Sequence, residues 1–251
     1  MITANVPIRQ FVSIVALSFI AGACGRIPGQ FEILNNQVPL DGCVIPTNQT
    51  VYQGQGRLDL SLVSGSATSA YLFFPLLKNN LDPSSSGVDV NQIDLNSFAV
   101  DITPVGTLAP ATQALFDSLN SDASLHWMLH TKSLWSGSIG SGGMLSAVVN
   151  AVPIELANRL RATQEIGISP SLALNLRVRA FGKTTSKDIE SDPFDFPIYV
   201  CEGCLVANVQ PCPYTVAPTN TGNACNSAQD DPVDCCLSGN DLLCPPPVVG
   251  K

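Results

Sequence analysis

The sequence has few charged side chains and no run of basic ones. Only 13% of its 251 residues are charged, and 12 Lys and Arg stand against 20 Asp and Glu, giving a net charge of −8. A nucleic-acid-binding protein needs clustered Lys and Arg to neutralise phosphates, so no nucleic acid is expected as a partner. The acidic balance also argues against electrostatic docking on anionic lipid. Any attachment to a membrane must therefore have another source.

A permanent membrane span is also lacking at the N-terminus. The apolar run FVSIVALSFI covers ten residues, 11–20, whereas a spanning helix needs about 20. Arg9 precedes this run and the small residues AGA follow it, which is the order found in a secretory signal peptide. An ordinary buried helix would leave the small residues and the following GRIPGQ unexplained. We therefore expect residues 1–23 to be a signal peptide that is removed on export.

The residue after this segment is a cysteine, and two kinds of cleavage fit it. Ala21 and Ala23 form the A-x-A pattern of the general signal peptidase, while the whole stretch AGAC resembles the lipobox of bacterial lipoproteins. In that family the cysteine sulfur receives a diacylglyceryl group, the chain is cut before it, and the new amine is acylated. The resemblance implies that Cys24 is the lipidated mature N-terminus and that acyl chains hold the protein on the membrane. Gly25 stands where an inner-membrane lipoprotein carries Asp, which implies the outer membrane of the cell envelope.

The cysteine count agrees with lipidation. Nine cysteines minus Cys24 leave eight, an even number that can form four disulfides in an oxidising compartment. These eight are Cys43, Cys201, Cys204, Cys212, Cys225, Cys235, Cys236 and Cys244. Seven of them follow residue 200, so complete pairing requires Cys43 to bond to one of the seven. The adjacent Cys235 and Cys236 are expected to have separate partners, and the rest of the connectivity stays open.

Cys201 and Cys204 have the C-x-x-C spacing of redox pairs and zinc knuckles. A thioredoxin-type motif requires a helix after the cysteines, and no helix signal follows them here. Zinc binding would need both cysteines to be free thiolates in an oxidising compartment. A structural disulfide is therefore the favoured interpretation, ahead of zinc or redox chemistry. The cysteine-rich end resembles those of predicted envelope lipoproteins from myxobacteria-like Gram-negative bacteria. We expect a tether at 24–55, a β-sandwich at 56–200 and a disulfide-stapled tail at 201–251.

Alternation of apolar and polar residues dominates the middle of the chain. In SLALNLRVRAF, every second residue from Leu172 to Ala180 is apolar, while Asn175, Arg177 and Arg179 fall on the other face. Six further strands are predicted, in RLDLSLV, AYLFFPLL, SFAVDIT, SLHWMLHT, MLSAVVNAV and FDFPIYV, and helices are predicted over 110–120 and 153–162. This pattern predicts an all-β, two-sheet antiparallel sandwich of immunoglobulin-like architecture. FPLLKNNL and IDLNSFAVDI also resemble water-stress and LEA-type sandwich domains.

The candidate sites are few. His126 and His130, the only histidines, would line one face of a helix with Asp122 and could then bind a metal. The alternation of Leu125, Trp127 and Leu129 instead predicts a strand, which would separate the two imidazoles by about 13 Å. No metal site is therefore predicted there. Oxygen ligands for calcium could come from one loop, which holds Asp188, Glu190, Asp192 and Asp195.

A second acidic group, Asp230, Asp231 and Asp234, lies between cysteines and is a weaker candidate for calcium. Solvated loop charge is the commoner role for both groups. No serine completes G-x-S-x-G, although Ser138 and Ser141 come close to it.

These patterns predict a non-catalytic, lipid-anchored envelope protein, a structural or interaction module without a cofactor. Its partner would be another envelope protein. Trp135 is either a core residue or an exposed anchor for that partner. The alternatives are a carrier with an apolar pocket between the sheets, and a hydrolase that uses loop carboxylates or histidine.

Overall fold

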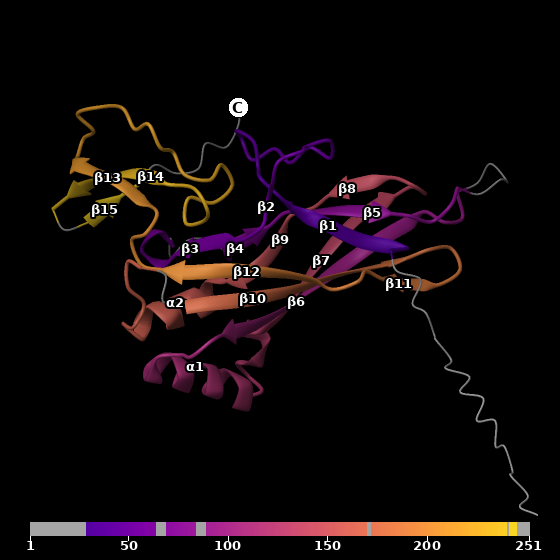
Figure 1. Ribbon diagram of the computed structural model, residues 1–251, viewed down its shortest axis with the longest axis horizontal. Helices are drawn as coiled ribbons and strands as arrows, with labels where there is room; N and C mark the ends of the chain where they lie inside the picture. The colour runs from indigo at the N-terminus through magenta and orange to yellow at the C-terminus, as the bar shows by residue number, and fades with distance from the viewer. Residues whose placement is uncertain (1–28, 64–68, 84–88, 170–171, 240, 245–251) are drawn as a thin grey trace, which may run out of the picture.

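The computed structural model describes residues 29–63, 69–83, 89–169, 172–239 and 241–244. The expected signal peptide, Cys24 and Gly25 lie outside these ranges. The described chain forms an all-β sandwich of two sheets with two short α-helices, as the sequence predicts (Figure 1). The helices are α1 (Pro110–Ser121) and α2 (Ile154–Ala162), close to the predicted bounds.

The larger sheet has six strands and carries most of the core. Its order is β3-β12-β10-β6-β7, with the short β11 paired to β10. The bounds are β3 Gly56–Asp59, β6 Ile93–Val105, β7 His130–Ile139, β10 Leu172–Lys183, β11 Asp188–Glu190 and β12 Phe194–Cys201. All pairs are antiparallel except β12 with β3. Alternation in β10 buries Leu172, Leu174, Leu176, Val178 and Ala180, as predicted.

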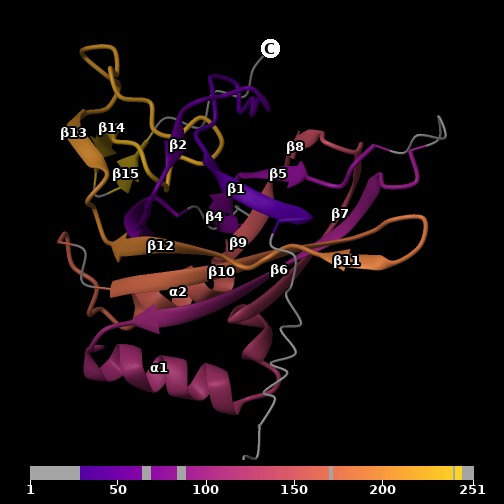
Figure 2. The same ribbon diagram turned by 45° about the vertical axis from the view of Figure 1, so that its right-hand side comes forward.

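The opposite layer is built from two shorter groups of strands, seen above the larger sheet in Figure 2. One has the order β2-β1-β5-β8, and the other pairs β4 with β9. Their bounds are β1 Phe31–Gln37, β2 Tyr52–Gln53, β4 Ser69–Phe73, β5 Pro75–Asn79, β8 Met144–Ser146 and β9 Val149–Pro153. Phe74 alone separates β4 from β5, so the predicted strand AYLFFPLL is real but divided between two pairings.

The core between the layers is filled by large side chains. Phe73, Phe98 and Phe196 have no exposed surface or almost none, and the rings of Phe73 and Phe196 meet at a centroid distance of 5.4 Å. Helix α2 closes one end with the buried side chains Leu156 and Leu160. Each such side chain contributes about 1.5–3 kcal/mol by leaving water. The positions 156, 157 and 160 share one face of α2, which is the face that it buries.

Predictions about local structure are wrong in three places. In the predicted strand RLDLSLV, the strand ends at Asp59 and Leu60–Leu62 form the 3-10 helix η1. Residues 31–37 fall inside the expected tether, yet they form β1, which lies between β2 and β5 and buries Phe31 and Ile33. The predicted strand SLHWMLHT contains instead the short 3-10 helix η2 (His126–Met128). Trp127 is 46% exposed there rather than buried.

The cysteine-rich tail forms a three-stranded sheet at one end of the sandwich (Figure 1). Its strands are β13 Val206–Pro211, β14 Val233–Ser238 and β15 Asp241–Leu243. All eight cysteines after Cys24 are paired, in the bridges Cys43–Cys225, Cys201–Cys204, Cys212–Cys236 and Cys235–Cys244. The prediction that one of the seven tail cysteines bonds to Cys43 is confirmed, and this cysteine is Cys225. The adjacent Cys235 and Cys236 are bonded to different partners, as also predicted.

Candidate functional site

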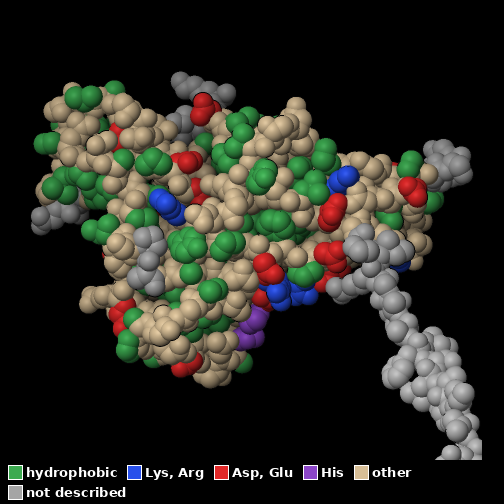
Figure 3. Space-filling view, in the orientation of Figure 1, with side chains coloured by type: hydrophobic (Ala, Val, Ile, Leu, Met, Phe, Trp, Pro, Cys, Tyr) green, Lys and Arg blue, Asp and Glu red, His purple; other side chains and the backbone are tan. Residues whose placement is uncertain are grey.

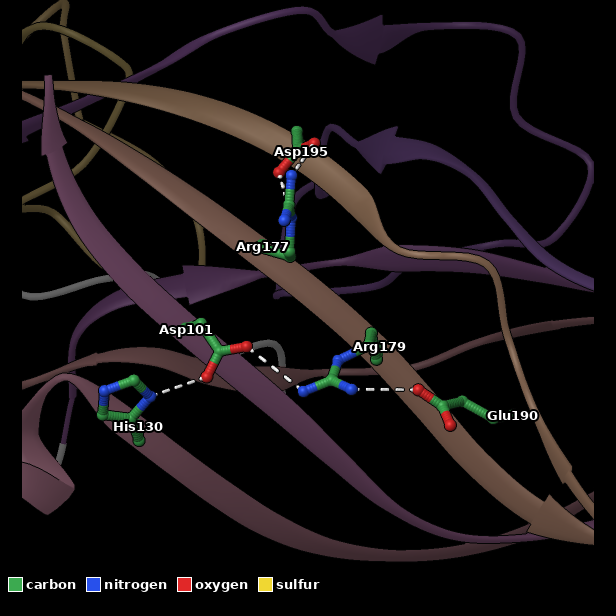
Figure 4. A network of polar contacts seen from close by, with 6 residues as sticks. All are labelled: Asp101, His130, Arg177, Arg179, Glu190 and Asp195. Atoms are coloured by element: carbon green, nitrogen blue, oxygen red, sulfur yellow. Dashed lines mark hydrogen bonds and ion pairs between the residues drawn. The ribbon is translucent and has the colours of Figure 1, made fainter.

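The outer face of the larger sheet carries a row of polar side chains. Residues His130 on β7, Asp101 on β6, Arg177 on β10 and Asp195 on β12 are direct cross-strand neighbours. Period-two alternation puts them on the face opposite the apolar core residues. The row therefore crosses four strands with basic and acidic side chains in alternation (Figure 4).

Asp101 lies at the centre of the contacts in this row. Its Oδ1 is 2.8 Å from Nδ1 of His130, and its Oδ2 accepts a hydrogen bond of 3.2 Å from Arg179. The other end of the Arg179 guanidinium donates to Glu190 at 3.0 Å. The chain of contacts His130–Asp101–Arg179–Glu190 thus links β7, β6, β10 and β11. Of these four residues only His130 and Glu190 were candidate site residues from the sequence, because Asp101 belongs to no motif.

Arg177 and Asp195 form a second, separate pair. Nε and Nη2 of Arg177 donate to the two carboxylate oxygens at 2.9 and 3.0 Å. This bidentate contact lowers the pKa of Asp195, with help from the Asn175 amide, and raises the pKa of Arg177. About half of each side chain stays exposed, 54% and 46%, so the pair adds little to stability. We therefore regard the row as a surface feature rather than a fold determinant.

The structure does not gather the four proposed calcium ligands. Asp195 pairs with Arg177, Glu190 with Arg179, and Asp188 with Lys183 at 3.8 Å. Asp192 is exposed. Since three of the carboxylates face a basic side chain instead of one another, the prediction of calcium at these residues finds no support in the geometry.

The second acidic group serves the tail rather than an ion. Asp234 is buried and accepts hydrogen bonds from Asn208, Thr219 and Asn220, which lower its pKa strongly. Asp230 lies apart from it, with Oδ1 3.0 Å from the hydroxyl of Tyr71. Burial raises the pKa of Asp230 to about 6. These carboxylates therefore have protein partners in place of calcium.

The C-x-x-C motif is closed as a disulfide, with a buried carboxylate beside it. Asp59 has no exposed surface and accepts hydrogen bonds from the backbone of Gly203 at 2.7 Å and Leu205 at 2.8 Å. A carboxylate oxygen of Asp59 and both sulfurs lie within 4.8 Å of one another. The two sulfurs are bonded to each other, so neither is a free thiolate for zinc or redox chemistry. The site therefore fits a structural bridge that fixes the start of the tail.

A hydrogen-bonded anchor between tail and sandwich was missed from the sequence. Gln229 is fully buried, and its side-chain amide bonds to both the N–H and the C=O of Leu72 on β4, at 2.8 and 3.0 Å. Asn226 donates to the carbonyl of Ala70 on the same strand at 2.9 Å. The side-chain amides of Gln229 and Asn226 thus make the backbone hydrogen bonds that a second neighbouring strand would make with this part of β4. A single Gln or Asn in a polar loop gives no sequence signal for such a role.

The remaining serine and tryptophan candidates do not assemble a catalytic site. Ser138 is exposed on β7, and Ser141 hydrogen bonds with Asp89 rather than with a histidine. Trp135 is half-buried and packs edge-on against Phe98 with a centroid distance of 6.4 Å. The structure thus favours the core role of Trp135 over that of an exposed anchor.

Three hollows in the described surface are open to solvent and have linings of mixed polar and apolar character. One of about 490 Å³ adjoins the polar row and is lined by Lys132, Phe181 and Glu190 among others. Two more lie near Gly29 and Asp192, with volumes of about 420 and 640 Å³. The hollow of about 420 Å³ is lined from both layers, by Phe31 of β1 and by Ile189 and Glu190 of β11, and it is open to solvent.

Among the described residues, no helix has the length and apolar character to cross a membrane. Comparison of the chain with protein-family models, curated proteins and solved structures finds no match. Its function therefore has to be argued from its own residues.

Proposed function

We propose that the protein is a lipid-anchored, non-catalytic module of the outer membrane that binds another envelope protein. The observation that carries this proposal is the lipobox-like AGAC, which follows a signal-peptide pattern and ends in Cys24. Pairing of the eight other cysteines with one another supports it, because none of these described cysteines is then left to bond to Cys24. Disulfides also accord with export to an oxidising compartment.

The polar row supports an interaction role in preference to catalysis. His130 and Asp101 form a base and its orienting carboxylate, but no serine or cysteine nucleophile has a hydrogen bond to His130 among the described contacts. The row offers charged groups of both signs on one face, beside an open hollow and the 87% exposed Leu134 of β7. Mixed charges around an exposed apolar residue suit the recognition of a protein surface.

The anchor is tested by labelling with a fatty acid. Cells that express the full chain are grown with a labelled fatty acid, and the protein is compared with the variants Cys24→Ser and Cys43→Ser. We expect label on the parent chain and on Cys43→Ser, and none on Cys24→Ser. An unlabelled parent chain, or label retained by Cys24→Ser, would overturn the lipoprotein assignment.

The interaction role is tested by crosslinking in intact envelopes followed by purification in detergent. We expect one envelope protein to be recovered in stoichiometric amount, and less of it with the charge-reversed variant Arg177→Glu. The control Lys187→Glu reverses an exposed charge outside the row. Recovery of no partner, or equal losses with both variants, would contradict the proposal.

A further inference from the structure

The two histidines of the chain lie together at the surface. The ring centroids of His126 and His130 are 4.0 Å apart, with an angle of 33° between the planes, and both side chains are exposed. Figure 3 shows the histidine side chains gathered at one place on the surface, beside acidic and basic groups. The strand predicted from the sequence would have kept them about 13 Å apart.

Local hydrogen bonds explain why the rings meet. After α1 ends, the Asp122 carboxylate accepts hydrogen bonds from the N–H and hydroxyl of Ser124, and the carbonyl of Asp122 accepts from the N–H of His126. These bonds start the turn η2, which brings position 126 back over position 130, where β7 begins. The spacing i, i+4 therefore acts as it does on a helix.

His130 is also held in one orientation. Its Nδ1 faces Asp101 Oδ1 at 2.8 Å, and Arg179 holds the other oxygen of that carboxylate. A carboxylate on Nδ1 places the proton there, and it leaves Nε2 as the lone-pair nitrogen. Metal-binding histidines commonly have this second contact, which fixes the tautomer and raises ligand basicity.

We propose that His126 and His130 together bind one divalent transition-metal ion, with Asp101 positioning His130. Two imidazoles suit Cu²⁺, Ni²⁺ and Zn²⁺, and the general order of affinities places Cu²⁺ first. Calcium and magnesium prefer oxygen ligands and are excluded from this pair of nitrogens. The remaining coordination positions face solvent and are open to water or to a group from a binding partner. This site is independent of the lipid anchor and extends the proposed function.

The surroundings limit the affinity of this site. The positive charges of Arg179 and Lys132 lie on the same face and oppose a cation, while Asp101 partly offsets them. Among the described residues, no third His, Cys or carboxylate joins the two rings in a group of three within 4.8 Å. We therefore expect weaker binding than at a structural zinc site with four protein ligands.

The test uses the full chain in detergent, without a histidine tag. Because only two histidines occur in the sequence, any imidazole that binds metal must be one of these. Cu²⁺ is titrated into the protein, followed by calorimetry and by electron paramagnetic resonance. We expect one ion per chain and nitrogen couplings from two imidazoles.

Single substitutions distinguish the two metal ligands from Asp101, which positions one of them. His126→Gln and His130→Gln should each remove one imidazole from the spectrum and weaken binding at least about tenfold, while Asp101→Asn should weaken it about 10- to 100-fold and keep both imidazoles. Asp195→Asn makes the same chemical change elsewhere in the row and should leave binding unchanged. Circular dichroism checks that each variant is folded.

The proposal is overturned if Cu²⁺ does not bind or if the double variant His126→Gln/His130→Gln binds it as tightly as the parent. It is also overturned if the spectrum lacks imidazole nitrogens. Equal weakening by Asp101→Asn and Asp195→Asn would remove the positioning role of Asp101 and leave only a general effect of surface charge.

Discussion

Replacement of Asp230 by Asn should change how the stability of the protein depends on pH. Asp230 belongs to the loop that joins the tail to the sandwich. Its Oδ1 accepts from the backbone N–H of Arg57 at 2.9 Å, and Gln229 donates to Oδ2 at 3.1 Å. Burial raises the pKa of this carboxyl from 3.8 to about 6 despite these hydrogen bonds. Asn keeps an acceptor at this position and tolerates its φ of 67°.

The sign and size of the change in stability with pH follow from the difference in proton binding between the folded and unfolded states. Because the folded carboxyl holds its proton more tightly than the unfolded one, the native state gains relative stability below about pH 4. This gain is lost as the pH rises through about 6. At about 1.4 kcal/mol for each pH unit between the two pKa values, the loss reaches about 3 kcal/mol above pH 7. Asp231, whose pKa burial also raises, adds a smaller change of the same sign.

The assay is unfolding in guanidinium chloride with disulfides intact, at several pH values from about 4 to 8. The free energy of unfolding of the parent should fall across this range relative to that of Asp230→Asn. At high pH, removal of the buried charge should raise the free energy of unfolding of the variant above that of the parent by up to about 3 kcal/mol. The hydrogen bond lost with Gln229 should reduce this difference by about 1 kcal/mol. Parallel pH profiles for the two proteins would refute the reasoning, since they would mean that the Asp230 charge is not destabilised by burial.

Three further perturbations test other parts of the fold. The pair Cys43→Ser/Cys225→Ser opens a loop with a sequence separation of 182 residues and should lower the free energy of unfolding by about 5 kcal/mol, measured in guanidinium chloride. Stability equal to that of the parent would show that the bridge does not constrain the unfolded chain. Gly56→Ala places a Cβ against the Tyr71 hydroxyl and Ile198, and should cost about 1–3 kcal/mol in thermal unfolding, because Tyr71 is held by Asp230. An unchanged midpoint would mean that this ring can move. Glu165→Gln weakens the acceptor for the N–H groups of Ala111 and Thr112 at the start of α1, so hydrogen exchange there should speed up while the amides of β10 are unaffected. Equal exchange in parent and variant would contradict the capping role.

The pairing of Cys43 shows how counting can predict a tertiary contact. Seven cysteines in the tail cannot all pair among themselves, so complete pairing with Cys24 set aside for lipid predicts a bridge to Cys43. The sequence could not choose Cys225 as the partner, since the choice depends on how the tail folds back over β3 and β4. That path is set by buried amides such as Gln229, which resemble any polar loop residue in sequence.

In the polar row, too, the sequence predicted which way the side chains point, and the fold decided which partners they contact. Alternation in the sequence placed Arg177 and Arg179 outward, because neighbouring side chains on a strand point to opposite faces. Their contacts with Asp195, Asp101 and Glu190 depend on strand order and register, which join segments up to 78 residues apart. For that reason the four carboxylates suggested calcium in the sequence, whereas in the fold Asp195 and Glu190 are paired with arginines and Asp188 with Lys183.

The sequence by itself determined the sandwich class, the two helices and the inward face of β10, and on the condition of complete pairing it predicted a bridge from Cys43 to the tail. Each of these follows from local periodicity or from parity, which need no knowledge of distant neighbours. Only the tertiary structure decided that residues 31–37 join a sheet, that Gln229 completes β4, and that His126 meets His130. The first outcome depends on pairing with distant strands, and the other two depend on hydrogen bonds between a backbone and a side chain. Such side-chain bonds can override an alternating apolar pattern as short as Leu125–Leu129.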